Sequence, residues 1–123
     1  MLLVEGTFWP LVVVGAVSDA SSDVVMTVDE HRLWSSDALR LALVVPGSGL
    51  CARKRQGELF RWLVRYRKIL FRRTVRVAFV IEDETLRTCA DTWLELASAR
   101  LCQGDINTFR TLKPALLWLS DSH

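Results

Sequence analysis

Residues 75–119 alternate twice between a strand pattern and a helix pattern, and this alternation constrains the fold more than any other feature of the chain. Residues 75–81 form a β-branched apolar run, which indicates a strand, and a capping cluster follows at 82–85. An amphipathic helix is predicted over 86–99, a short strand over 106–109 and a closing helix over 112–119. Residues 75–119, which we call the tail, are therefore predicted to have the order β-α-β-α.

The preceding part of the chain supplies further elements of both kinds. Residues 2–4 and 11–17 are predicted to form a hairpin around a Glu5-Gly6-Thr7 turn. A central strand over 39–45, apolar apart from Arg40, ends at a Pro-Gly-Ser-Gly turn. The longest predicted helix covers 51–73, where apolar residues recur at helical spacing, at Leu59, Leu63, Tyr66 and Leu70.

The tail is similar in sequence to the end of the STAS-like domains of the SpoIIAA-like group. In that group an R-V-A-x-V strand leads to a helix, a short strand ending in Phe and an A-x-x-W-L helix. The matching residues are Arg76, Val77, Ala78, Val80, Phe109, Ala115, Trp118 and Leu119. The resemblance implies an α/β fold with a mixed sheet, helices mainly on one face, and the order β-β-α-β-α-β-α-β-α.

The same resemblance assigns a helix to residues 24–34, where the pattern itself is ambiguous. Val24, Met26 and Val28 alternate like a strand, whereas Val24, Val25 and Val28 share a helical face. A helix is the prediction for this segment, with a strand as the alternative.

Length and composition fit one STAS-like domain over residues 1–123. The three cysteines lack a C-x-x-C spacing, which favours a reducing compartment, and only two histidines are present as co-ligands, so neither a metal nor a cofactor is predicted. A secretory signal is disfavoured because the first ten residues carry no Lys or Arg. No apolar run approaches the ~18 residues of a membrane span, and a cytoplasmic protein is expected.

The basic residues are concentrated in one part of the chain. Of sixteen Lys and Arg residues, ten lie between positions 53 and 76, with only one acidic residue among them. Four of them recur at helical spacing and are predicted to share one face: Arg61, Arg65, Lys68 and Arg72. Such a row predicts an anionic partner, namely a lipid surface, an acidic protein or a nucleic acid backbone. The alternative is a solvated face with counter-charges from neighbouring helices.

The turn formed by Gly47, Ser48 and Gly49 is a second candidate site. It lies between a predicted strand and a helix, where backbone amides can hold an anion. Ser48 with the two residues after it resembles the Ser-Gly-Leu of anti-sigma-factor antagonists, in which the serine is phosphorylated. The spacing of the glycines and Ala52 also fits a dinucleotide-binding pattern. The plain alternative is a tight turn that needs glycine.

No catalytic constellation is present in the sequence, since neither histidine has a carboxylate or nucleophile at a recognisable spacing. Of the five tryptophans, three are expected in the core (Trp62, Trp93 and Trp118), whereas Trp9 and Trp34 lie near element ends. The favoured interpretation is a non-enzymatic binding or regulatory module that recognises an anionic or amphiphilic partner through its basic helix. A small nucleotide-binding protein or enzyme, a nucleic-acid-binding protein and a homo-oligomer remain open alternatives.

Overall fold

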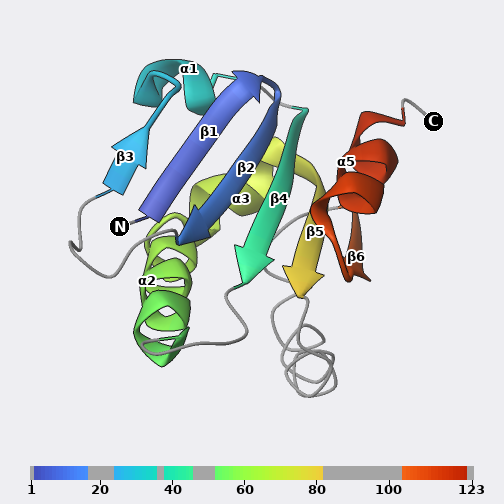
Figure 1. The fold of residues 1–123 in the computed structure, drawn as a ribbon. Helices are drawn as coiled ribbons and strands as arrows, with labels where there is room; N and C mark the ends of the chain where they lie inside the picture. Colours follow the sequence, from blue (N-terminus) through green and yellow to red (C-terminus); the bar gives the residue numbers. More distant parts are fainter. Residues whose placement is uncertain (1, 17–23, 36–37, 46–51, 82–103, 122–123) are drawn as a thin grey trace.

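The computed structural model describes residues 2–16, 24–35, 38–45, 52–81 and 104–121. In these ranges a six-stranded mixed sheet in the order β3-β1-β2-β4-β5-β6 carries helices on both faces (Figure 1). The strands are β1 (Leu2–Phe8), β2 (Leu11–Ala16), β3 (Val24–Met26), β4 (Leu39–Val45), β5 (Thr74–Ile81) and β6 (Asp105–Phe109). The helices are α1 (Glu30–Leu33), α2 (Ala52–Arg65), α3 (Arg67–Arg73) and α5 (Leu112–Ser120).

Strand directions follow from the connections between the strands. β1 and β2 pair antiparallel across a two-residue turn, whereas every other pair in this sheet is parallel. Two neighbouring parallel strands must be joined by a crossover connection. The connection from β4 to β5 contains α2 and α3 (Figure 1). The α/β class with a mixed sheet is confirmed. The predicted helix over 86–99 lies outside the described residues.

The hairpin of β1 and β2 is confirmed, but its predicted turn is wrong. The turn consists of Trp9 and Pro10, which are joined by a cis peptide bond, and the Trp9 amide donates to the Gly6 carbonyl at 3.0 Å. Gly6 itself lies within β1, where a side chain would collide with Val28: a Cβ there would lie 2.5 Å from the Val28 Cβ. The glycine therefore permits a close approach between segments.

The helix predicted for residues 24–34 is wrong over its first half. Val24–Met26 is β3, which pairs parallel to the edge of β1, and only the four residues of α1 are helical. The Asp29 carboxylate accepts from the His31 amide at 3.1 Å, which caps the helix at its observed start. The order of the described elements accordingly contains a third strand before α1.

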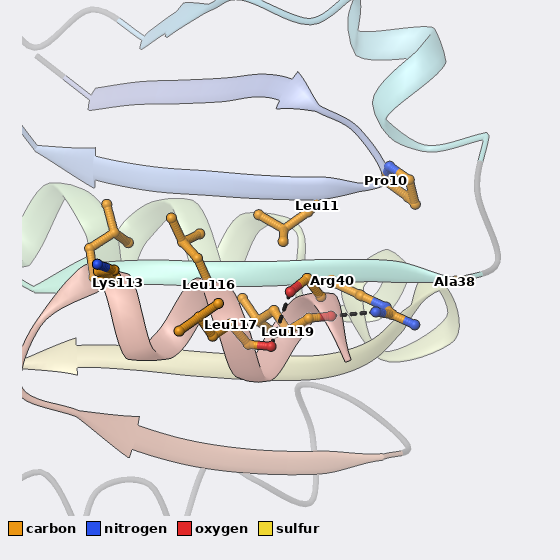
Figure 2. Close-up of a pocket in the computed structure, with 10 residues that line it drawn as sticks. Pro10, Leu11, Ala38, Arg40, Lys113, Leu116, Leu117 and Leu119 are labelled. Atoms are coloured by element: carbon orange, nitrogen blue, oxygen red, sulfur yellow. Dashed lines mark hydrogen bonds between the residues drawn. The ribbon is translucent and has the colours of Figure 1, made fainter. Parts of the chain in front are cut away.

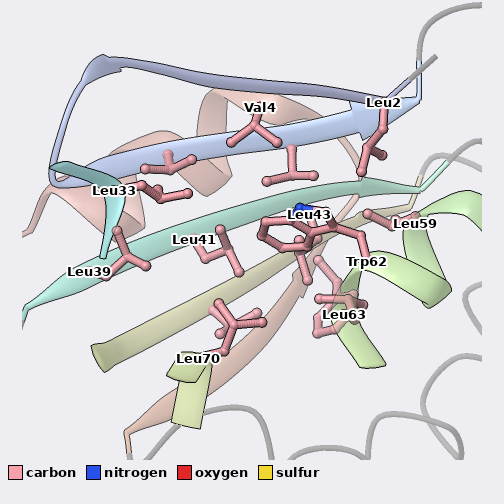
Figure 3. Packing of buried hydrophobic residues seen from close by; sticks show 14 of the residues in the cluster. Leu2, Val4, Leu33, Leu39, Leu41, Leu43, Leu59, Trp62, Leu63 and Leu70 are labelled. Carbon is pink, nitrogen blue, oxygen red and sulfur yellow. The ribbon is translucent and has the colours of Figure 1, made fainter. Parts of the chain in front are cut away.

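The larger core lies between one face of the sheet and the helices α1, α2 and α3. It is built from alternating strand residues, such as Leu41 and Leu43 on β4, and from Leu59, Trp62 and Leu70 on the helices (Figure 3). Trp9 and Trp34 pack partly buried against this core. Trp62 is buried as expected, and Trp93 lies outside the described residues.

A smaller core lies between the opposite face and α5. Ala115 and Leu119 are fully buried against Ala42 and Ala78, because the small strand side chains allow the helix to approach closely. Trp118 is only half-buried, and its ring lies 5.7 Å from that of Phe109. Among the described helices, three therefore cover one face of the sheet and α5 covers part of the other (Figure 1).

The β6 edge of the sheet carries two local features. A Cβ at Gly104 would collide with the Val75 carbonyl oxygen, so only glycine fits just before β6. Within β6 the Thr108 amide donates to the side-chain oxygen of Asn107 at 2.9 Å. The edge strand thus uses its own side chain to satisfy a backbone donor.

Candidate functional site

The helical pair α2 and α3 carries the predicted basic row. The structure divides the single helix predicted over 51–73 at Tyr66, whose φ of −104° and ψ of 14° leave the helical range. Hydrogen bonds still span the break, from the Tyr66 amide to Trp62 at 3.1 Å and from the Leu70 amide to Tyr66 at 2.9 Å. One long surface therefore runs along both helices.

Aromatic packing accompanies this break. The Tyr66 ring lies 5.2 Å from Trp34 and 5.3 Å from Trp62, between centroids, and the two tryptophan rings are 6.2 Å apart. These three rings join the helical pair to the segment after α1. The buried side of α2 and α3 is therefore anchored to the larger core, and the outer side of the two helices faces solvent.

The four predicted basic residues all lie on this outer side, and each is exposed. We refer to Arg61, Arg65, Lys68 and Arg72 as the basic row. Within the described part of the chain, none of the four forms an ion pair or a hydrogen bond; Arg65 makes a cation–π contact with Tyr66 at 5.5 Å. The counter-charges of the solvated-face alternative are therefore not found among these residues.

Exposed apolar side chains lie beside the basic row, and the sequence interpretation missed them. Phe60, Val64 and Phe71 each precede a basic residue and are 47%, 52% and 36% exposed. Their spacing of i, i+4 and i+11 is itself a helical signal, offset by one position from the basic row. The buried stripe of α2 and α3 by itself explains an amphipathic pattern, so the sequence does not single these three residues out. The outer surface of α2 and α3 therefore combines positive charge with apolar groups.

A second feature, an apolar groove of about 800 Å³, lies on the opposite face of the sheet between α5 and strands β2 and β4 (Figure 2). We call it the α5 groove. Its walls come from Pro10 in the hairpin turn, from Leu11 at the start of β2, from the start of β4, and from one side of α5. The lining residues of that helix are Leu112, Lys113, Leu116, Leu117, Leu119 and Ser120. The groove exists because α5 packs over β4, β5 and β6 and leaves β2 uncovered on this side (Figure 1).

Two cationic side chains lie at the ends of the α5 groove. Figure 2 shows Lys113 at one end, and Arg40 at the other end near Pro10. Nη1 of Arg40 donates to the carbonyl oxygens of Leu119 and Asp121, the latter at 3.1 Å. Lys113 is exposed and has no hydrogen bond or ion pair with another described residue.

Several predicted features lie outside the described residues, including the turn of Gly47, Ser48 and Gly49 and the three cysteines. The described ranges contain no group of three or more His, Cys, Asp and Glu side chains placed to hold a metal ion. Of the described helices, none combines the length and apolar character that a bilayer crossing requires.

Comparison with known proteins yields no relatives for this chain. No protein family matches the sequence, no curated protein matches it, and no solved structure matches its fold.

Proposed function

We propose that this chain is a non-enzymatic binding module that docks onto an anionic phospholipid surface through the outer side of α2 and α3. The observation that carries the proposal is the basic row without counter-charges among the described residues, directly beside exposed Phe60, Val64 and Phe71. A solvated helix face has no need of exposed aromatic rings. An interfacial helix uses both groups, because the cations attract the lipid headgroups and the apolar side chains insert beneath them.

The proposal extends to the family and to the location of the protein. We propose a STAS-like fold related to the SpoIIAA-like group. The β1–β2 hairpin, the parallel run β4-β5-β6 and the closing α5 support it, while β3 departs from the expected order. A cytoplasmic location agrees with the lipid proposal, because the cytoplasmic leaflet carries the anionic lipids.

Vesicle binding tests the lipid proposal directly. The protein is mixed with phosphatidylcholine vesicles, with and without phosphatidylserine, and bound protein is measured by co-sedimentation. We expect binding that requires phosphatidylserine and weakens as salt is raised. The quadruple variant of the basic row to Gln should lose this binding and keep its thermal unfolding temperature, since the four side chains are exposed.

Two single variants form a matched pair for the location of the surface. Lys68→Gln removes a cation from the basic row, and Lys113→Gln removes an exposed cation from the opposite face of the sheet. At about 1 kcal/mol per cation near the membrane, Lys68→Gln should weaken vesicle binding roughly fivefold, whereas Lys113→Gln should leave it unchanged. Equal effects of the two variants would contradict docking through α2 and α3.

The apolar residues separate a lipid surface from other anionic partners. Phe60→Ser with Phe71→Ser should weaken vesicle binding and leave retention on DNA unaltered, because a nucleic acid backbone is bound by charge alone. If the wild type binds DNA more tightly than phosphatidylserine vesicles at equal salt, a nucleic acid is the partner and the lipid proposal is wrong.

A further inference from the structure

The α5 groove has the dimensions and lining of a small-molecule site. Its volume of about 800 Å³ lies within the range of roughly 300 to 1,000 Å³ that ligand pockets occupy. Among the described lining residues the walls are almost entirely apolar, with Leu11 from β2 and leucines from α5, and the polar side chains are those of Arg40, Lys113 and Ser120. Since the Ser120 hydroxyl donates to the Leu117 carbonyl at 3.0 Å, the two cations are the polar side chains that can orient a ligand within the described part of the lining.

The hydrogen bonds of Arg40 leave one side of its guanidinium available. The two N–H groups of Nη1 can serve the carbonyl oxygens of Leu119 and Asp121, which anchors the side chain at the end of α5. Nε and Nη2 donate to none of the described residues. These two nitrogens form the parallel pair of donors that matches a carboxylate in a bidentate contact. A cation that is already held in place loses little conformational entropy when it binds an anion.

The shape of the groove selects among carboxylates. Figure 2 shows the groove running along α5 from Arg40 past Leu116 and Leu117 toward Lys113, so the apolar wall is elongated. A compact aromatic acid would leave much of this wall exposed to water, whereas a single alkyl chain can cover its length. Lys113 can lay its aliphatic stem along the chain and keep its ammonium group in solvent.

We propose that the α5 groove binds a single-chain fatty acid, with its carboxylate at Nε and Nη2 of Arg40 and its alkyl chain along Leu116 and Leu117. This site lies on the face of the sheet opposite the basic row, and it does not depend on the lipid-surface proposal.

The direct test is a fluorescence displacement titration with laurate, myristate and palmitate, each below its critical micelle concentration. Affinity should rise with chain length, by up to about fourfold per added CH₂ group. Dodecanol, which has the length of laurate and no charge, should bind at least about tenfold more weakly than laurate. Equal affinity of acid and alcohol, affinity independent of chain length, or absence of binding would overturn the proposal.

Arg40 and Arg76 form a matched pair of variants for the carboxylate contact. Both arginines donate to carbonyl oxygens at the end of α5, but only Arg40 lines the groove. Arg40→Gln should weaken laurate binding by about tenfold or more, whereas Arg76→Gln should leave it within about twofold of wild type. If both variants lose binding to the same extent, the arginines act only on the helix end, and the assigned carboxylate site is wrong.

A variant of the exposed wall of the groove tests the proposal even if Arg40→Gln does not fold. Leu117 lines the groove and is 64% exposed, so Leu117→Glu should fold and should weaken laurate binding through charge repulsion and lost apolar contact. Val64→Glu, an exposed position on α2, serves as its control and should not change laurate binding. The quadruple Gln variant of the basic row should also keep laurate binding, which distinguishes failure of this proposal from failure of the vesicle-binding proposal.

Discussion

Arg40 on β4 and Arg76 on β5 are register partners that donate to the same acceptor, the carbonyl oxygen of Asp121. Their Nη1 atoms lie 3.1 Å and 3.0 Å from that oxygen. Arg76 also donates to the Trp118 carbonyl at 2.8 Å and lies over the Trp118 ring at 5.2 Å. Two cations therefore satisfy the carbonyl groups at the C-terminal end of α5, where the helix dipole favours positive charge.

The shared acceptor predicts coupling between the two arginines. Arg40→Gln and Arg76→Gln should each lower the free energy of unfolding by about 1 to 3 kcal/mol, because a charge-assisted hydrogen bond is lost. The double variant should lose more than the sum, by about 0.5 kcal/mol or more, since either arginine alone still serves Asp121 and no longer faces a neighbouring like charge. Urea unfolding of the four proteins measures this, and simple additivity would show that the shared oxygen is unimportant.

Two leucines two positions apart on α5 should differ sharply in their contribution to stability. Leu119→Ala removes a fully buried side chain and should lower the free energy of unfolding by about 2 to 5 kcal/mol. Leu117→Ala, at an exposed position, should change it by about 0.5 kcal/mol or less. Thermal and urea unfolding of both variants provide the comparison. A large loss in Leu117→Ala would mean that the groove side of α5 is covered in solution.

Thr74 and Thr27 should respond in opposite ways to substitution by valine, because their hydroxyl groups differ in hydrogen bonding. Thr74 is buried, and its Oγ1 has no hydrogen-bond partner among the described residues, so Thr74→Val should stabilise the protein by about 1 kcal/mol. Thr27 Oγ1 accepts from the Gly6 amide at 3.0 Å, so Thr27→Val should destabilise it by about 0.5 to 1.5 kcal/mol. The two substitutions have the same shape change, and opposite signs in urea unfolding are the expected result.

Glycine substitutions should separate a position that needs glycine from one that tolerates a side chain. Gly104→Ala would place its Cβ against the Val75 carbonyl oxygen and should cost about 1 to 3 kcal/mol or more. Gly57 lies within α2, with nothing within 4 Å of an added Cβ, so Gly57→Ala should stabilise the protein by roughly 0.5 to 1 kcal/mol. Circular dichroism during heating measures both. A stabilising Gly104→Ala would contradict the close packing at the start of β6.

The sequence predicted the elements with strong local patterns. The strand before Glu82, the central strand around Leu41 and the closing helix with Ala115 and Leu119 all occur within a residue or two of their predicted bounds. Each is specified by its own apolar periodicity, which needs no information from distant residues. The basic row was also visible as a local spacing, and its four members are exposed on α2 and α3.

Features that depend on distant partners could not be predicted in this way. Gly6 was interpreted as a turn residue, yet its role is to accommodate Val28 from another segment. The strand at Val24–Met26 is too short to show its period, and its pairing with β1 decides its conformation. The α5 groove combines Leu11 and Arg40 with one side of α5, so no single stretch of sequence contains its signal.

The internal hydrogen bond of Asn107 on β6 has a consequence for self-association. An edge strand presents unpaired backbone donors and acceptors to any other extended chain. Pairing of this kind is a common start of edge-to-edge aggregation. β6 is an edge strand among the described strands, and its Asn107 side chain already accepts from the Thr108 amide, so this amide is less available as a donor to an incoming strand. We therefore expect the Asn107 side chain to disfavour fibril-like growth by strand addition at this edge of the sheet.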